Sequence, residues 1–174
     1  MSVSVLVRCL LLALLLNIVA GCGYHLTNSQ AQRLGVAQKI WVPFFSNESI
    51  SPTAQTVLRR AFYDELHSLR GMIPADSESR ADLTMKARIT SYSSQAVSYT
   101  ALDQAREFKL SLEVELEISK SGLLVPIWKG KINALKQYPA SRDLALQRNA
   151  EEQALDAVAR IISHKFISAV EESY

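Results

Sequence analysis

The sequence of 174 residues has little of what catalytic or disulfide-stabilised proteins depend on. It contains two cysteines and three histidines, and none of them stands at a spacing typical of a metal site. It also lacks a glycine-rich phosphate loop and a nucleophile elbow. The charge is nearly balanced, with 19 Lys and Arg against 17 Asp and Glu, which gives no general attraction to nucleic acid. We therefore expect a protein that is not an enzyme, binds no metal or cofactor, and does not act on nucleic acid.

One acidic cluster is the best remaining candidate for catalysis. Glu113, Glu115 and Glu117 stand two residues apart, which places them on one face of a strand. General acid catalysis needs a carboxyl group with a raised pKa, and the sequence places no neighbouring acid to raise one. A solvated sheet face is the better interpretation, and a hydrolase acting on envelope polymers is the alternative in which these residues would be catalytic.

The N-terminus carries the most informative pattern. Residues 10–20 are apolar except for Asn17, Arg8 precedes them, and the small residues Ala20 and Gly21 stand directly before Cys22. The run is too short to span a membrane, which needs about 20 apolar residues. Positive charge, apolar run and small residues predict a signal peptide over 1–21.

The end of this segment, Val19-Ala20-Gly21-Cys22, resembles a bacterial lipobox. The resemblance implies that Cys22 receives an S-diacylglycerol, that the chain is cut before it, and that the new amino group is acylated. Three acyl chains, at about 0.8 kcal/mol per buried methylene, hold a protein on a membrane essentially permanently. Plain secretion is the alternative, but it would leave Cys22 as a lone thiol, because Cys9 is lost with the signal.

After the lipidation site, residues 22–35 are mostly polar and predict a short lipidated tether. The rest, 36–174, contains no repeat, glycine-rich linker or low-complexity segment. Its length suffices for one domain with a hydrophobic core, and we expect a single α+β domain there.

Alternation of apolar and polar side chains predicts the strands of that domain. The first places Ile40, Val42 and Phe44 on one face and ends near Pro43, after which 46–49 turns the chain. In the clearest strand, 108–118, every second residue is apolar. The predicted strands are 39–45, 83–90 with a polar continuation over 91–100, 108–118, and 124–137 as its hairpin partner after a turn at 119–122.

Apolar residues three or four positions apart predict two helices. The first starts at Ser51-Pro52 and stops at Gly71, with Glu65 and His67 among the residues facing water. The second spans about 143–170. The apolar stripe of the first is Ala54, Val57, Leu58, Ala61, Phe62, Leu66 and Leu69, and that of the second is Ala150, Ala154, Ala157, Val158, Ile161, Ile162, Phe166 and Ala169.

The resulting order is β-α-β-β-β-α. It predicts an α+β fold in which two helices pack on one face of a mainly antiparallel four-stranded sheet.

The other face of this sheet is predicted to carry a basic set, whose members share a spacing of two: Lys86, Arg88, Lys109, Lys129 and Lys131. With Tyr92, Tyr99 and Trp128 beside them, these cations would suit the phosphates and acyl chains of an amphiphile. The alternative is an ordinary charged surface that is balanced by the three glutamates of the acidic cluster.

Several segments together resemble the lipopolysaccharide-assembly lipoprotein family, LptE, in its shorter form. The resemblance spans nearly all of the mature chain, and its more specific parts are the Cys-Gly-Tyr start and the Val-Pro-Phe-Phe-Ser-Asn segment. It rests on Gly21-Cys22-Gly23-Tyr24-His25-Leu26, on Ile-Trp-Val-Pro-Phe-Phe-Ser-Asn over 40–47, on Ala81-Asp82-Leu83, on Val-Ser-Tyr-Thr-Ala over 97–101, and on the final amphipathic helix.

The resemblance implies a non-enzymatic lipoprotein of the outer membrane. Members of the family plug the lumen of a large β-barrel, LptD, and bind lipopolysaccharide on its way to the outer leaflet. Gly23 fits this location, because Asp after the acylated cysteine commonly retains a lipoprotein at the inner membrane. The alternative class is a scaffold lipoprotein of another envelope assembly machine, or a peptidoglycan-binding module.

Overall fold

The computed structural model describes Leu34 and residues 37–173. The predicted signal peptide 1–21, the lipidation site Cys22 and nearly all of the predicted tether 22–35 lie outside the described residues. The described elements are β1 (Lys39–Trp41), β2 (Ser46–Asn47), α2 (Ala54–Tyr63), the π-helical turn η2 (Asp64–Leu69), β3 (Ile73–Pro74), the 3-10 turn η3 (Glu78–Arg80), β4 (Leu83–Tyr99), β5 (Ala105–Lys120), β6 (Trp128–Pro139) and α3 (Leu144–Glu172).

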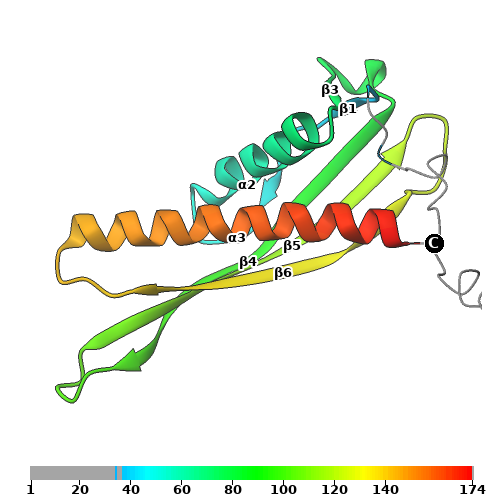
Figure 1. The fold of residues 1–174 in the computed structure, drawn as a ribbon. Helices are drawn as coiled ribbons and strands as arrows, with labels where there is room; N and C mark the ends of the chain where they lie inside the picture. The colour runs from blue at the N-terminus through cyan, green and yellow to red at the C-terminus, as the bar shows by residue number, and fades with distance from the viewer. Residues whose placement is uncertain (1–33, 35–36, 174) are drawn as a thin grey trace, which may run out of the picture. The chain divides into compact units, whose positions relative to one another are not determined.

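The strands form one mixed sheet in the order β3-β1-β4-β5-β6, and β2 pairs with β4 as well. The long strands β4, β5 and β6 are antiparallel, whereas β1 and β2 run parallel to β4. Both helices lie on the same face of this sheet (Figure 1). The predicted α+β class and element order are confirmed, but the sheet has six strands, because β2 and β3 add two short ones.

The alternation predicted for β5 is confirmed along its length. Leu110, Leu112, Val114, Leu116 and Ile118 are buried beneath the helices, and the residues between them face the opposite, open side. A bulge at Thr90 shifts the register of β4 by one residue. The shift turns Tyr92 toward the helices, where its hydroxyl donates to Glu151 of α3.

The first predicted strand is wrong in its second half, because Pro43 interrupts the alternation. Pro43 has no N–H to give to a ladder, and β1 already ends at Trp41. Phe45 takes the buried position predicted for Phe44, which is 77% exposed. The chain then pairs with β4 as β2, where a turn was predicted.

The first helix starts later than predicted and buries one residue that was expected in water. It begins at Ala54, because Ser51 is held in the preceding loop, where its carbonyl accepts from Asn47 at 2.7 Å. Glu65 is buried, since the wider π-helical turn brings it within 4.0 Å of Arg70.

His67 is likewise half-buried rather than solvated. Its Nδ1 lies 2.8 Å from the carbonyl oxygen of Met72 and its ring packs on Tyr63, with 4.9 Å between ring centroids. His164, by contrast, is exposed on α3 as predicted. Gly71 ends the turn with a φ of 65°, a left-handed conformation that glycine adopts without strain.

The buried face of the last helix, α3, is rotated about the helix axis relative to the predicted apolar stripe. Ile161 is exposed, because α3 packs on α2 as well as on the sheet and turns a neighbouring flank inward. The buried residues of α3 are Ala154, Leu155, Val158, Ala159, Ile162, Ser163, Phe166, Ile167 and Val170.

A chain of aromatic rings links the two helices to the sheet. Phe62 of α2 meets Phe166 of α3 edge to face at 5.5 Å, and Phe166 meets Trp128 of β6 at 5.3 Å. Phe45 contacts the other side of Phe62 at 5.8 Å. Such edge-to-face pairs stabilise a core beyond the area they bury. Leu34 also lies in this core.

Candidate functional site

The face of the sheet away from the helices, here called the open face, carries rows of alternating charge. The register places Arg88 of β4, Glu115 of β5 and Lys131 of β6 side by side. The next row contains Lys86, Glu117 and Lys129 in the same order of strands. Glu115 and Glu117 therefore each lie between two cations.

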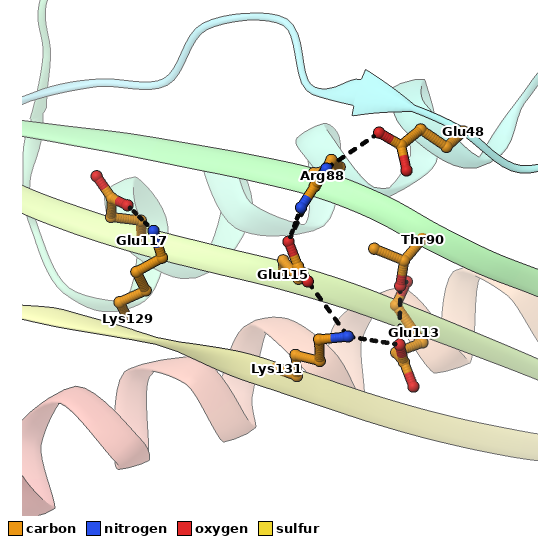
Figure 2. Close-up of polar contacts among 8 residues, drawn as sticks. All are labelled: Glu48, Arg88, Thr90, Glu113, Glu115, Glu117, Lys129 and Lys131. Carbon is orange, nitrogen blue, oxygen red and sulfur yellow. Dashed lines mark hydrogen bonds and ion pairs between the residues drawn. The ribbon is translucent and has the colours of Figure 1, made fainter.

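These side chains form ion pairs across the strands (Figure 2). Arg88 pairs with Glu115 on one side and with Glu48, 3.2 Å away, on the other. The Nζ of Lys131 lies 3.2 Å from Glu115 and 3.6 Å from Glu113. Lys129 pairs separately with Glu117 at 3.0 Å, and the hydroxyl of Thr90 donates to Glu113 at 2.9 Å.

The pairs hold their members in the charged form. The guanidinium of Arg88, and then Lys131, lower the pKa of the Glu115 carboxyl below its usual value. Glu115 in turn raises the pKa of Arg88 and of Lys131. A carboxyl whose pKa is lowered is a poor general acid, so Glu115 is unsuited to that role.

A cleft of about 470 Å³ lies beside the ion pairs. Pro43 and Phe44, from the segment between β1 and β2, form one wall, and charged residues of β4, β5 and β6 form the floor. The exposed ring of Phe44 is packed by the guanidinium of Arg59, 4.5 Å from its centroid. The cleft thus offers one apolar ring next to a polar surface that carries three cations and two glutamates.

The structure brings together four members of the predicted basic set, namely Lys86, Arg88, Lys129 and Lys131, all exposed on the open face. The fifth, Lys109, lies six residues from Glu115 along β5, which is roughly 20 Å. Three of the four, Arg88, Lys129 and Lys131, form ion pairs with glutamates, as expected for the alternative of a balanced charged surface. Among the described residues, Lys86 pairs with no acid.

The predicted aromatic neighbours of this set are wrong. Trp128 packs on Phe166, and Tyr92 bonds to Glu151, so both lie on the helix-covered face. Tyr99 is exposed, but at the far end of β4. For Tyr92 the sequence could not show this, because the bulge at Thr90 reverses the facing of the residues that follow it, up to the next irregularity after Ala96.

Sequence reasoning missed a second surface, here called the hairpin end, where the β4–β5 turn meets the β6–α3 loop. The N–H of Ala140 donates to the carbonyl of Arg106 at 2.9 Å, and Arg142 donates to Gln104. In the described part of the chain, neither arginine pairs with an acid. Four large apolar side chains are exposed around them: Tyr99, Leu102, Leu144 and Leu146. These residues belong to turns without periodicity, so no sequence pattern joins them.

Within 37–173 no group of three or more His, Cys, Asp or Glu side chains is placed to hold a metal ion. No helix of that range has the length and apolarity required to cross a bilayer.

The family model of the lipopolysaccharide-assembly proteins, LptE, matches residues 37–170. Among curated protein sequences, none matches closely enough to count as a relative. The structure is similar to that of the rare lipoprotein B from Shewanella oneidensis, with a TM-score of 0.56 and 12% identity over 78% of this chain and 95% of that one. It is also similar to a putative lipoprotein from Caulobacter crescentus, with a TM-score of 0.51 and 14% identity over 72% and 87%. At such identities the likeness concerns the fold alone.

Proposed function

The chain belongs to the LptE lipopolysaccharide-assembly family, and on that premise we propose that it plugs and supports an outer-membrane β-barrel of the LptD type. The family consists of non-enzymatic lipoproteins of lipopolysaccharide assembly in the bacterial envelope. In this proposal the protein is anchored to the outer membrane by acyl chains on Cys22. It binds lipopolysaccharide and assists its assembly into the outer leaflet.

One observation carries the proposal: within the described residues no helix covers the open face, and that face is mostly polar and charged. The lumen of a large outer-membrane barrel is itself polar, so a protein inside it must present polar surface. On the open face Arg88, Glu115 and Lys131 form ion pairs with one another. When a partner covers such a face, these side chains are not buried as unpaired charges, which would cost much more free energy. Charges paired in advance therefore support a face that is covered in the assembled complex.

Photo-crosslinking in cells tests the plug. Photo-reactive residues are introduced at Lys131 on the open face and at Arg160, exposed on the opposite side in α3. A protein enclosed by a lumen contacts its wall on both sides, so both positions should crosslink to the same large barrel protein. Crosslinks from one side only would indicate surface docking, and a different envelope partner at both positions would favour a scaffold lipoprotein.

Two surfaces compete for lipopolysaccharide in this proposal. The first is the predicted basic set, Lys86, Arg88, Lys109, Lys129 and Lys131, of which Lys86, Arg88 and Lys129 line the cleft with Phe44. The second is the hairpin end, where Arg106 and Arg142, which form no ion pair within the described residues, adjoin exposed apolar side chains. Neither guanidinium group pairs with an acid among the described residues, so each can bind phosphate without first breaking an ion pair, which favours the hairpin end.

A direct binding assay with purified lipopolysaccharide separates the two. Replacing Arg106 and Arg142 with Ser should weaken binding by about 100-fold or more, since each lost hydrogen bond to a charged group costs about 1.5–3 kcal/mol. Replacing Lys86, Arg88, Lys129 and Lys131 with Ser is the matched comparison. A larger loss in this second variant would assign the ligand to the open face, and unchanged affinity in both would remove lipopolysaccharide binding from the proposal.

A further inference from the structure

The loop between β5 and β6 exposes three consecutive large apolar side chains. Leu123, Leu124 and Val125 are 58%, 104% and 71% exposed. Elsewhere in the described residues, large exposed apolar side chains occur singly or at alternate positions. A run of three exposed apolar residues is unfavourable in water and calls for a partner.

The loop is held in an outward conformation. The N–H of Ile127 donates to the carbonyl of Ile118 at 2.8 Å and closes the base of the loop. At the tip, Leu123 N–H donates to Lys120 at 3.1 Å, and Gly122 has a φ of 83°, which allows the tight turn. The three apolar residues therefore do not fold back onto the core.

Hydrogen bonds through Asp82 fix this loop next to β1. The N–H of Ser121 donates to the carbonyl of Asp82 at 2.9 Å, and the N–H of Asp82 donates to the carbonyl of Lys39 at 2.8 Å. The carboxylate of Asp82 accepts from the Lys39 N–H, also at 2.8 Å. In Figure 1 the loop and β1 accordingly lie at one end of the sheet, with the β4–β5 turn at the other.

The length of chain before β1 connects this end to the membrane. About 15 residues separate Cys22 from Ala37, and a fully extended chain of that length spans at most about 50 Å. The hairpin end lies a further 50 Å away, roughly, along the strands. Lys39 and Lys120, both exposed, flank the loop and suit anionic lipid headgroups.

We propose that residues 123–125 insert into the headgroup region of the bilayer that holds the acyl chains of Cys22. The inference rests on the proposed acylation of Cys22. Because those chains already make binding essentially permanent, the loop adds orientation rather than affinity: it holds the β1 end of the domain against the lipid and directs the hairpin end away from it.

Site-directed spin labelling tests the loop directly. Cys9 is lost with the predicted signal and Cys22 is acylated, so one introduced cysteine provides a single labelling site. Leu124→Cys is compared with Leu102→Cys, which is also exposed but lies at the hairpin end. The full lipidated chain is reconstituted in vesicles of phosphatidylethanolamine and phosphatidylglycerol. The ratio of accessibility to oxygen over accessibility to a water-soluble nickel chelate should be severalfold higher at position 124.

The outcomes separate this inference from the proposed anchor. Mass spectrometry of the N-terminal peptide from the same preparation reports acylation independently. With Cys22 acylated, equal water exposure of the labels at 124 and 102 would overturn the insertion and leave the anchor standing. A label at 124 shielded from both reagents would indicate a protein contact and also overturn it. A free Cys22 thiol would remove the anchor and the insertion together.

Discussion

The two faces of the sheet differ although they alternate along the same strands. In β5, Leu112, Val114 and Leu116 lie under the helices, while the glutamates between them lie on the open face. The covered face is closed by this chain's own helices, whereas the polar open face has no layer over it within the described residues (Figure 1). The difference teaches that the covered face specifies the fold, whereas the open face contributes little to specifying it.

The energies of the two faces differ in the same way. A fully buried large apolar side chain stabilises the fold by about 1.5–3 kcal/mol relative to the exposed state. Ion pairs between solvent-exposed side chains contribute little, because water and salt screen them. Substitutions on the two faces should therefore differ sharply in their effect on the free energy of unfolding, which the following predictions test.

The largest effect is expected in the aromatic chain. Phe166 is fully buried and contacts both Phe62 and Trp128. Phe166→Ala should lower the free energy of unfolding by about 3–5 kcal/mol, through lost burial and the cavity left behind. Denaturant unfolding of the full chain measures the loss. Phe166→Leu, which fills most of the space, is the control and should cost clearly less.

Gly130 should give the next largest effect. A Cβ on this residue would lie 2.8 Å from two ring atoms of Trp128, so the indole would have to leave its contact with Phe166. Gly130→Ala should destabilise the fold by about 1–3 kcal/mol, a typical cost of overpacking. In a Trp128→Leu background the same substitution should cost much less. An equal cost in both backgrounds would show that the ring is not the cause.

The cap of α3 should contribute about 1 kcal/mol. The carboxylate of Asp143 accepts from the N–H groups of Ala145 and Leu146 at 2.8 and 3.2 Å. Asp143→Ala leaves both donors without this partner and should lower the free energy of unfolding accordingly. Asp143→Asn keeps an acceptor oxygen and should retain most of the stability. Equal losses would contradict a capping role.

The sequence predicted what depends on periodicity and missed what depends on interruptions of it. The strand at 108–118 and the helix at about 143–170 were found, because the spacing of their apolar residues is a local signal. Pro43 and the bulge at Thr90 each shift the facing of later residues by one. Because these shifts were not foreseen, Phe44 was predicted to lie in the core and Tyr92 on the open face, and both predictions were wrong.

The candidate site, like the fold, was predictable where it depends on periodicity within a strand. The shared facing of Lys86, Arg88, Lys129 and Lys131 follows from spacing alone, and the structure has all four on the open face. Which cation meets which glutamate depends on the register between strands, which spacing within a strand does not fix. The hairpin end joins Arg106 to the β6–α3 loop through tertiary hydrogen bonds, for which the sequence carries no pattern.

The smallest effect is expected on the open face itself, with a distinct pH dependence. Because Arg88 and Lys131 lower the pKa of Glu115 in the folded state, its contribution to stability is present above the unfolded pKa of about 4.3 and is lost as pH falls through the folded value. Glu115→Gln should therefore lower the Tm slightly at neutral pH, with the difference from the original protein vanishing in acid and shrinking in high salt. Thermal unfolding of both proteins across pH measures this. A loss as large as that of Phe166→Ala would mean that the open face also specifies the fold, and the contrast between the two faces would no longer hold.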